Sequence, residues 1–176
     1  MSGNLFRWLL QSAIVVLLSA GNGAAEEPQS AMRTEILKAV ESRRSSVWQT
    51  AQKIWLAAEP GYQELQSSSL LADLLESAGL KVTRGIAGMP TAFTAEIGSG
   101  TPVIGILGEY DALPGLSQTA DPEQRPRADG NGYGHGCGHH LFGTASASAA
   151  MAVADQIRSG RLSGTVRYYG CPAEEG

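Results

Sequence analysis

An almost unbroken apolar run covers residues 102–107 and ends at two acidic residues, in the stretch PVIGILGEYDALPGL. A short apolar run bounded by turn residues is typical of a strand that is buried on both faces of a sheet. A second strand-like segment, 92–97, comes just before it, and Gly98-Ser99-Gly100-Thr101 between them has turn chemistry. We therefore expect two adjacent strands, with 102–107 inside a sheet.

Three segments have the periodicity of amphipathic helices: 31–58, 70–78 and 141–157. Pro60-Gly61 ends the first, and Gly79 stands where the second needs a left-handed C-cap. Short strands are expected at 81–84 and 165–170. This order of elements predicts an α/β fold, a layered mixed sheet with flanking helices.

The first 25 residues have the pattern of a secretory signal peptide. Arg7 precedes the apolar segment 8–20, and small residues follow at 23–25. The apolar segment is shorter than the roughly 20 residues that a membrane-spanning helix needs. We expect cleavage near Ala25, a mature domain over 26–176, a secreted or periplasmic location and no stable membrane insertion. A net charge of −4 over 176 residues argues against a nucleic-acid partner.

All three histidines of the chain lie within the stretch YGHGCGHHLFGTAS. This stretch closes a connection of about thirty residues that is dense in Gly, Pro, Asp and Asn, and connections this long are usually functional or disordered. Thiolate and imidazole are good ligands for Zn²⁺, and Cys-x-His places Cys137 and His139 on one side of an extended segment. The start of the helix expected at 141–157 is also predicted to lower the pKa of the Cys137 thiol.

Two pairs of acids could complete a hydrolytic metal site, which needs one carboxylate to hold an ion and another to accept a proton from water. Glu174 and Glu175 follow the last expected strand. Glu109 and Asp111 leave the carboxyl end of the 102–107 strand, the edge at which open α/β sheets build their sites.

Taken together, GEYDALPGLSQ, GHGCGHHLFGTAS and VRYYGCPAEEG resemble the dinuclear-metal amidohydrolases and carboxypeptidases that include aminoacylase, hippurate hydrolase and auxin-conjugate hydrolases. The branch most similar to this chain contains the B subunit of p-aminobenzoyl-glutamate hydrolase. The resemblance implies the N-terminal portion of a metallopeptidase-type catalytic domain, with two divalent ions, Zn or Mn. It implies metal ligands at Cys137, His139 and Glu175, a general base at Glu174 and a supporting carboxylate at Asp111. The implied substrate is an N-acyl or N-aroyl amino acid or a dipeptide-like molecule.

The chain departs from the family pattern at two positions. Glu109 stands where the wider superfamily has a ligating His, and His140 stands where many relatives have Asp, so the roles of Glu109, His140 and His135 stay open. Relatives carry two further histidine ligands downstream and an inserted dimerisation domain. We therefore expect an N-terminal fragment that is inactive by itself and a homodimer or hetero-oligomer when the protein is full length.

Two alternatives remain beside the metallohydrolase. A thiol hydrolase would use Cys137 as nucleophile with His135 or His139 as base. A secreted inactive fragment or metal-binding α/β module would instead hold a disulfide between Cys137 and Cys171, which an exported protein can form. A dinucleotide-binding loop is disfavoured, because the glycines of DGNGYGHGCG miss the Gly-x-Gly-x-x-Gly spacing.

Overall fold

The computed structural model describes residues 28–176, so the predicted signal peptide lies outside the described residues. The chain divides into two compact units, 1–35 and 36–176. The described part of the first unit is the beginning of α2 (Pro28–Ser42), and all other elements belong to the second. Within residues 28–176, none of the helices is long and apolar enough to cross a membrane.

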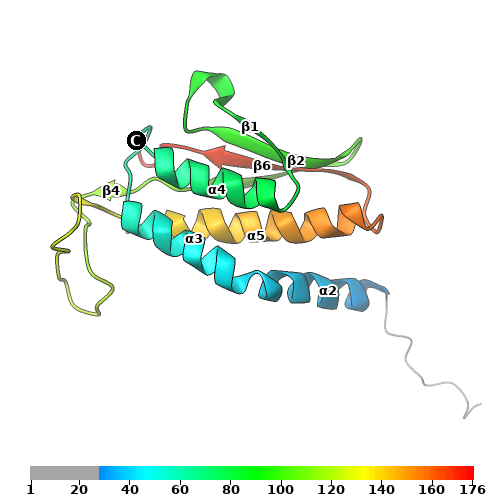
Figure 1. Cartoon of the computed structure of the whole chain (residues 1–176), viewed down its shortest axis with the longest axis horizontal. Coiled ribbons are helices and arrows are strands. Elements are labelled where there is room, and N and C mark those ends of the chain that lie inside the picture. The colour runs from blue at the N-terminus through cyan, green and yellow to red at the C-terminus, as the bar shows by residue number, and fades with distance from the viewer. Residues whose placement is uncertain (1–27) are drawn as a thin grey trace, which may run out of the picture. The chain divides into compact units, whose positions relative to one another are not determined.

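A four-stranded mixed sheet forms the centre of the second unit (Figure 1). The order of its strands is β1-β2-β6-β3. Its strands are β1 (Lys81–Arg84), β2 (Phe93–Ser99), β3 (Val103–Glu109) and β6 (Gly164–Cys171). β6 pairs antiparallel with β2 and parallel with β3, and the crossover between β3 and β6 runs through α5 (His139–Arg158). The predicted α/β class with a mixed sheet is confirmed.

The expected adjacency of the two central strands is wrong, because β6 inserts between β2 and β3. β3 is an edge strand in the described chain, and Val103, Ile104 and Leu107 are 51%, 56% and 57% exposed. The most buried strand is β6, whose Val166 and Tyr168 are both under 2% exposed, while Arg167, Tyr169 and Cys171 are partly exposed. An apolar run alone cannot tell a central strand from an edge strand, since the position in the sheet depends on where the crossover returns the chain.

The single helix expected at 31–58 is broken at Arg43 into α2 and α3 (Arg44–Ala57). Serine hydroxyls take backbone acceptors on both sides of the break: Ser42 Oγ donates to the Ala39 carbonyl at 2.8 Å and Ser46 Oγ to the Arg43 carbonyl at 2.9 Å. Such local hydrogen bonds compete with the hydrogen bonds of a regular helix. The apolar periodicity of the sequence does not reveal this competition.

α4 (Leu65–Ser77) begins several residues earlier than its apolar periodicity predicts. The carboxylate of Glu59 accepts the free N–H groups of Gln66 and Ser67 at 3.0 and 2.8 Å, and so caps the first turn from outside the helix. The predicted end is confirmed, since Gly79 has a φ of 83°.

α4 and α5 pack on the sheet, and α3 packs against both helices (Figure 1). The core between these layers is apolar and aromatic, and Phe93 stacks on Tyr110 and Tyr168. Gly143 brings α5 close to β3, because a Cβ there would lie 2.5 Å from the Glu109 carbonyl oxygen. The Tyr168 hydroxyl also donates to the Gly143 carbonyl at 3.0 Å. These contacts fix the start of α5, and therefore His139, against the end of β3.

Candidate metal centre

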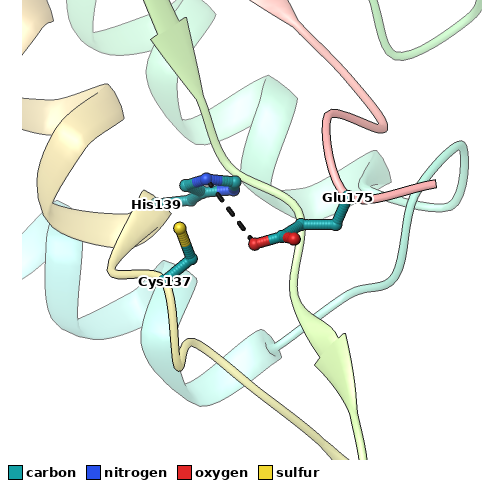
Figure 2. Close-up of side chains that lie close together, drawn as sticks. All are labelled: Cys137, His139 and Glu175. Carbon is teal, nitrogen blue, oxygen red and sulfur yellow. Dashed lines mark ion pairs between the residues drawn. The ribbon is translucent and has the colours of Figure 1, made fainter.

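Three segments that are distant in the sequence meet at one edge of the sheet: the end of β3, the start of α5 and the loop after β6. β3 and β6 run parallel with Glu109 opposite Cys171, so the residues that follow both strands emerge together. The start of α5 completes the site (Figure 2).

His139 lies at the centre of this cluster and is 3% exposed. Its Nδ1 lies 2.8 Å from Asp111 Oδ1, while its Nε2 lies 3.2 Å from Glu109 and 3.8 Å from both Glu174 and Glu175. The tautomer with its proton on Nδ1 donates to Asp111 and leaves Nε2 for an ion. This is the tautomer that a metal-ligating histidine uses.

Asp111 is 1% exposed and uses both of its oxygens. Oδ1 meets His139 Nδ1, and Oδ2 accepts the backbone N–H of Glu175 at 2.9 Å. One buried carboxylate therefore fixes the imidazole ring and the backbone of the Glu pair at the same time.

Cys137, His139 and Glu175 can each place a ligand atom within 4.8 Å of the other two. Figure 2 shows the Cys137 and Glu175 side chains pointing toward the His139 ring from two different loops. Glu109, His139 and Glu174 form a second group of the same size. Both groups depend on His139, whose Nδ1 already meets Asp111, so one nitrogen is available for the two groups.

The cluster has an excess of negative charge. Burial raises the pKa of Glu109, and repulsion from Glu174, Asp111 and Glu175 adds to this effect, against a lowering contribution from His139. A hydrogen bond to Glu175 raises the pKa of the Cys137 thiol, together with desolvation and the charges of nearby acids. This direction is opposite to the lowering of the Cys137 pKa that the sequence predicts, and the nearby carboxylates account for the difference together with desolvation.

A divalent cation would reverse this balance, since it stabilises thiolate and carboxylate forms together. Sulfur, nitrogen and oxygen donors in one small cluster are the ligand set that suits Zn²⁺ and similar ions. The residues present therefore fit a metal centre.

His135 and His140 lie outside both groups, although they are neighbours of the ligands in sequence. Their ring centroids are 5.0 Å apart, and His135 Nε2 lies 3.1 Å from the Ile54 carbonyl oxygen. Burial lowers the pKa of both, that of His140 to about 4, so both rings are neutral near pH 7. These contacts attach the loop before α5 to α3.

Both cysteines are free thiols, so the disulfide between Cys137 and Cys171 that accompanied one alternative is not present in the structure. The raised pKa of Cys137 also disfavours the thiol hydrolase, whose nucleophile requires a lowered thiol pKa.

Two residues that shape this site, Gly143 and Glu64, were not predicted from the sequence. Gly143 allows the close approach of α5 to β3, and Glu64 accepts a hydrogen bond from the loop that carries the Glu pair. Neither has a signal in the sequence, because a glycine in an alanine-rich helix and an acid before a helix are both common.

No family model matches the chain. It is 48% identical over 138 residues to the B subunit of p-aminobenzoyl-glutamate hydrolase from Escherichia coli, covering 78% of this chain and 29% of that protein. It is 31% identical over 153 residues to IAA-amino acid hydrolase ILR1-like 2 of Arabidopsis thaliana, covering 85% of this chain and 33% of that protein. The chain thus spans about a third of the length of these curated relatives.

Solved structures that are similar to this chain include that of a Bacillus subtilis protein, YXEP, described as a dinuclear metal binding peptidase from the M20 family. The TM-score is 0.65 and the identity 27%, over 77% of this chain and 37% of that one. The chain is therefore homologous to hydrolases that include the p-aminobenzoyl-glutamate and IAA-amino acid enzymes, and it shares its fold with a peptidase of the M20 family.

Proposed function

We propose that the chain is part of a metal-dependent amidohydrolase that cleaves N-acyl or N-aroyl amino acids. The observation that carries this proposal is the convergence of sulfur, imidazole and carboxylate groups around the buried His139. In this proposal Cys137, His139 and Glu175 bind metal, and the full-length protein holds two divalent ions, Zn or Mn. The dinuclear metal binding of the Bacillus subtilis neighbour supports the number of ions.

When bound, the ions would polarise the scissile carbonyl as Lewis acids and lower the pKa of bound water. Glu174, whose side chain is 51% exposed, is the general base and accepts the proton of the attacking water at a carboxylate oxygen. The same carboxyl group can then return that proton to the departing amine. Asp111 plays a different part, because its two oxygens are occupied by His139 and the Glu175 N–H. It holds the ligands in place and orients the His139 ring so that Nε2 faces the other donors.

The names of the two curated relatives support the substrate class, since one is a hydrolase of p-aminobenzoyl-glutamate and the other of IAA-amino acids. The word "subunit" in the first name supports an oligomeric full-length protein, as a hetero-oligomer or a homodimer. The signal-peptide pattern of residues 1–25 supports export to the periplasm or the outside of the cell.

A second candidate applies to the chain taken by itself, namely ion binding without turnover. The two groups of possible ligands share one available imidazole nitrogen, which favours one weakly held ion over a complete pair. Turnover would then require ligands from a longer protein.

Titration of the purified chain with Co²⁺ tests the metal site, because a thiolate ligand gives a cobalt charge-transfer band. We expect this band in the wild-type chain and in Cys171→Ser, and its loss in Cys137→Ser and after addition of a chelator. A free ion concentration of 100 times Kd should raise the free energy of unfolding by about 2.7 kcal/mol. A chain that gives neither the band nor the stabilisation has no metal site of this kind.

The hydrolytic step is tested in the longest protein that contains this chain, by measuring release of free amino acid from N-acyl amino acids. Glu174→Gln should lower kcat by about 10²- to 10⁴-fold, the usual contribution of a general base, and leave metal content unchanged. Full activity of this variant would remove Glu174 from the proposed role.

A further inference from the structure

A buried acid outside the metal cluster holds the loop that carries Glu174 and Glu175. Glu64, just before α4, is 0% exposed, and its Oε1 accepts the backbone N–H of Ala173 at 2.8 Å. Ala173 has a φ of 55°, in the left-handed region that residues with a Cβ rarely adopt. The residue next to the Glu pair is thus held in an uncommon conformation by one hydrogen bond to a buried carboxylate.

The second oxygen of Glu64 has no hydrogen-bond partner among residues 28–176. A buried carboxylate is costly unless it is paired or fully hydrogen-bonded, so packing alone does not explain an acid here. This incompletely hydrogen-bonded carboxylate contacts the loop that supplies the proposed base and a proposed ligand.

The turn formed by residues 59–64 contacts both strand-end loops of the site. The Glu59 carbonyl oxygen accepts the N–H of Ala112, which follows Asp111, at 2.9 Å. At Gly61 a Cβ would lie 2.9 Å from the Ala173 Cβ, so the backbone of the turn and Ala173 are in close contact. In Figure 1 the C-terminal end of the chain accordingly lies beside the start of α4. The turn therefore supports the loop after β3 and the loop after β6 together.

We propose that Glu64 is a positioning residue for the metal centre, whose buried carboxylate fixes the backbone at Ala173 and so directs Glu174 and Glu175 toward His139. Asp111 accepts the N–H of Glu175 from one side, and Glu64 accepts the N–H of Ala173 from the other. The two carboxylates hold alternate peptide groups of the same short loop. This inference rests on the proposed metal site.

The test compares Co²⁺ and Zn²⁺ affinity in Glu64→Met, Glu64→Gln and the wild-type chain, by competition with a chromophoric chelator. Glu64→Met keeps the length of the side chain but removes the acceptor, and we expect binding to weaken by about 10- to 100-fold, the usual effect of losing a group that orients a ligand. Glu64→Gln keeps an amide oxygen for the Ala173 N–H and should bind within about threefold of wild type. Glu76→Gln, at an exposed acid on α4, is the control for the loss of one negative charge.

A Glu64→Met chain that is folded and binds metal as tightly as wild type would overturn the proposal, since a purely structural role lowers the melting temperature alone. If Glu64→Met does not fold, Gly61→Ala provides the second test, because its added Cβ displaces Ala173 and leaves Glu64 in place. Weaker metal binding in this variant supports the proposal and unchanged binding refutes it. Failure of the wild-type chain to bind metal would instead refute the proposed function.

Discussion

The two ends of α5 differ in how their acidic side chains are paired. At the C-terminal end, Asp155 lies between Arg43, at 2.7 Å, and Arg158, and Arg158 also donates to the Ala78 carbonyl at the end of α4. At the N-terminal end, His139 faces four carboxylates, and no Lys or Arg of residues 28–176 forms an ion pair with any of them. The acid of the first network is paired with two arginines of the protein, whereas the four acids of the second network have no such partner among residues 28–176 and would be compensated by a bound cation.

The largest effect is expected from Asp111→Leu, which leaves His139 Nδ1–H and the Glu175 N–H without their acceptor. Each unsatisfied buried donor costs about 1 to 3 kcal/mol, so the free energy of unfolding should fall by about 3 kcal/mol in urea denaturation. Metal affinity should also fall by about 10- to 100-fold. Asp111→Asn keeps one acceptor oxygen, so its free energy of unfolding and its metal affinity should fall by less. Equal metal affinity in Asp111→Leu and wild type would remove Asp111 from the site.

A smaller effect is expected from Gly143→Ala, which tests whether the close approach of α5 to β3 sets the geometry of the N-terminal end. The added Cβ meets a backbone oxygen that cannot rotate away, so the clash should outweigh the gain of about 1 kcal/mol in helix propensity. We expect a net loss of about 1 to 2 kcal/mol in thermal unfolding and weaker Co²⁺ binding. Ser146→Ala on the same helix is the control, and a stabilised Gly143→Ala chain would contradict the prediction.

The smallest effect is expected at the C-terminal end of α5. Burial raises the pKa of Asp155, but hydrogen bonds and charges from Arg43 and Arg158 lower it by more. The net pKa therefore lies below the usual value of 3.8. A lowered carboxyl pKa stabilises the fold above the unfolded-state pKa, and this contribution is lost as pH falls through the folded-state pKa. Asp155→Asn should therefore cost at most about 1 kcal/mol near neutral pH. The difference from wild type should shrink below about pH 4 in urea denaturation, with metal affinity unchanged at neutral pH. A large change in metal affinity would show that the two ends are coupled.

Much of the fold follows from local patterns. Periodicity and turn residues suffice to predict the strand at 81–84, the left-handed cap at Gly79 and most of α5, because these features depend on neighbours in the sequence. The helix α5 begins at His139, two residues earlier than its apolar periodicity predicts. The predicted adjacency of the strands at 92–97 and 102–107 is wrong, because insertion of β6 between β2 and β3 depends on where the long crossover through α5 returns the chain. The break at Arg43 was missed since it depends on serine hydroxyls that compete for backbone acceptors.

The sequence by itself determined which donors this protein can offer to a cation: one thiol and one imidazole two residues apart, and a pair of acids after the last strand. Tertiary structure alone decided that Asp111 binds His139 and the Glu175 backbone, that Glu109 joins the cluster, and that Glu64 lies beneath the Glu pair. The physical reason is that ligand chemistry is a property of residue types, which the chain states directly. Orientation and charge balance arise only when parallel strand ends and a helix start are packed together.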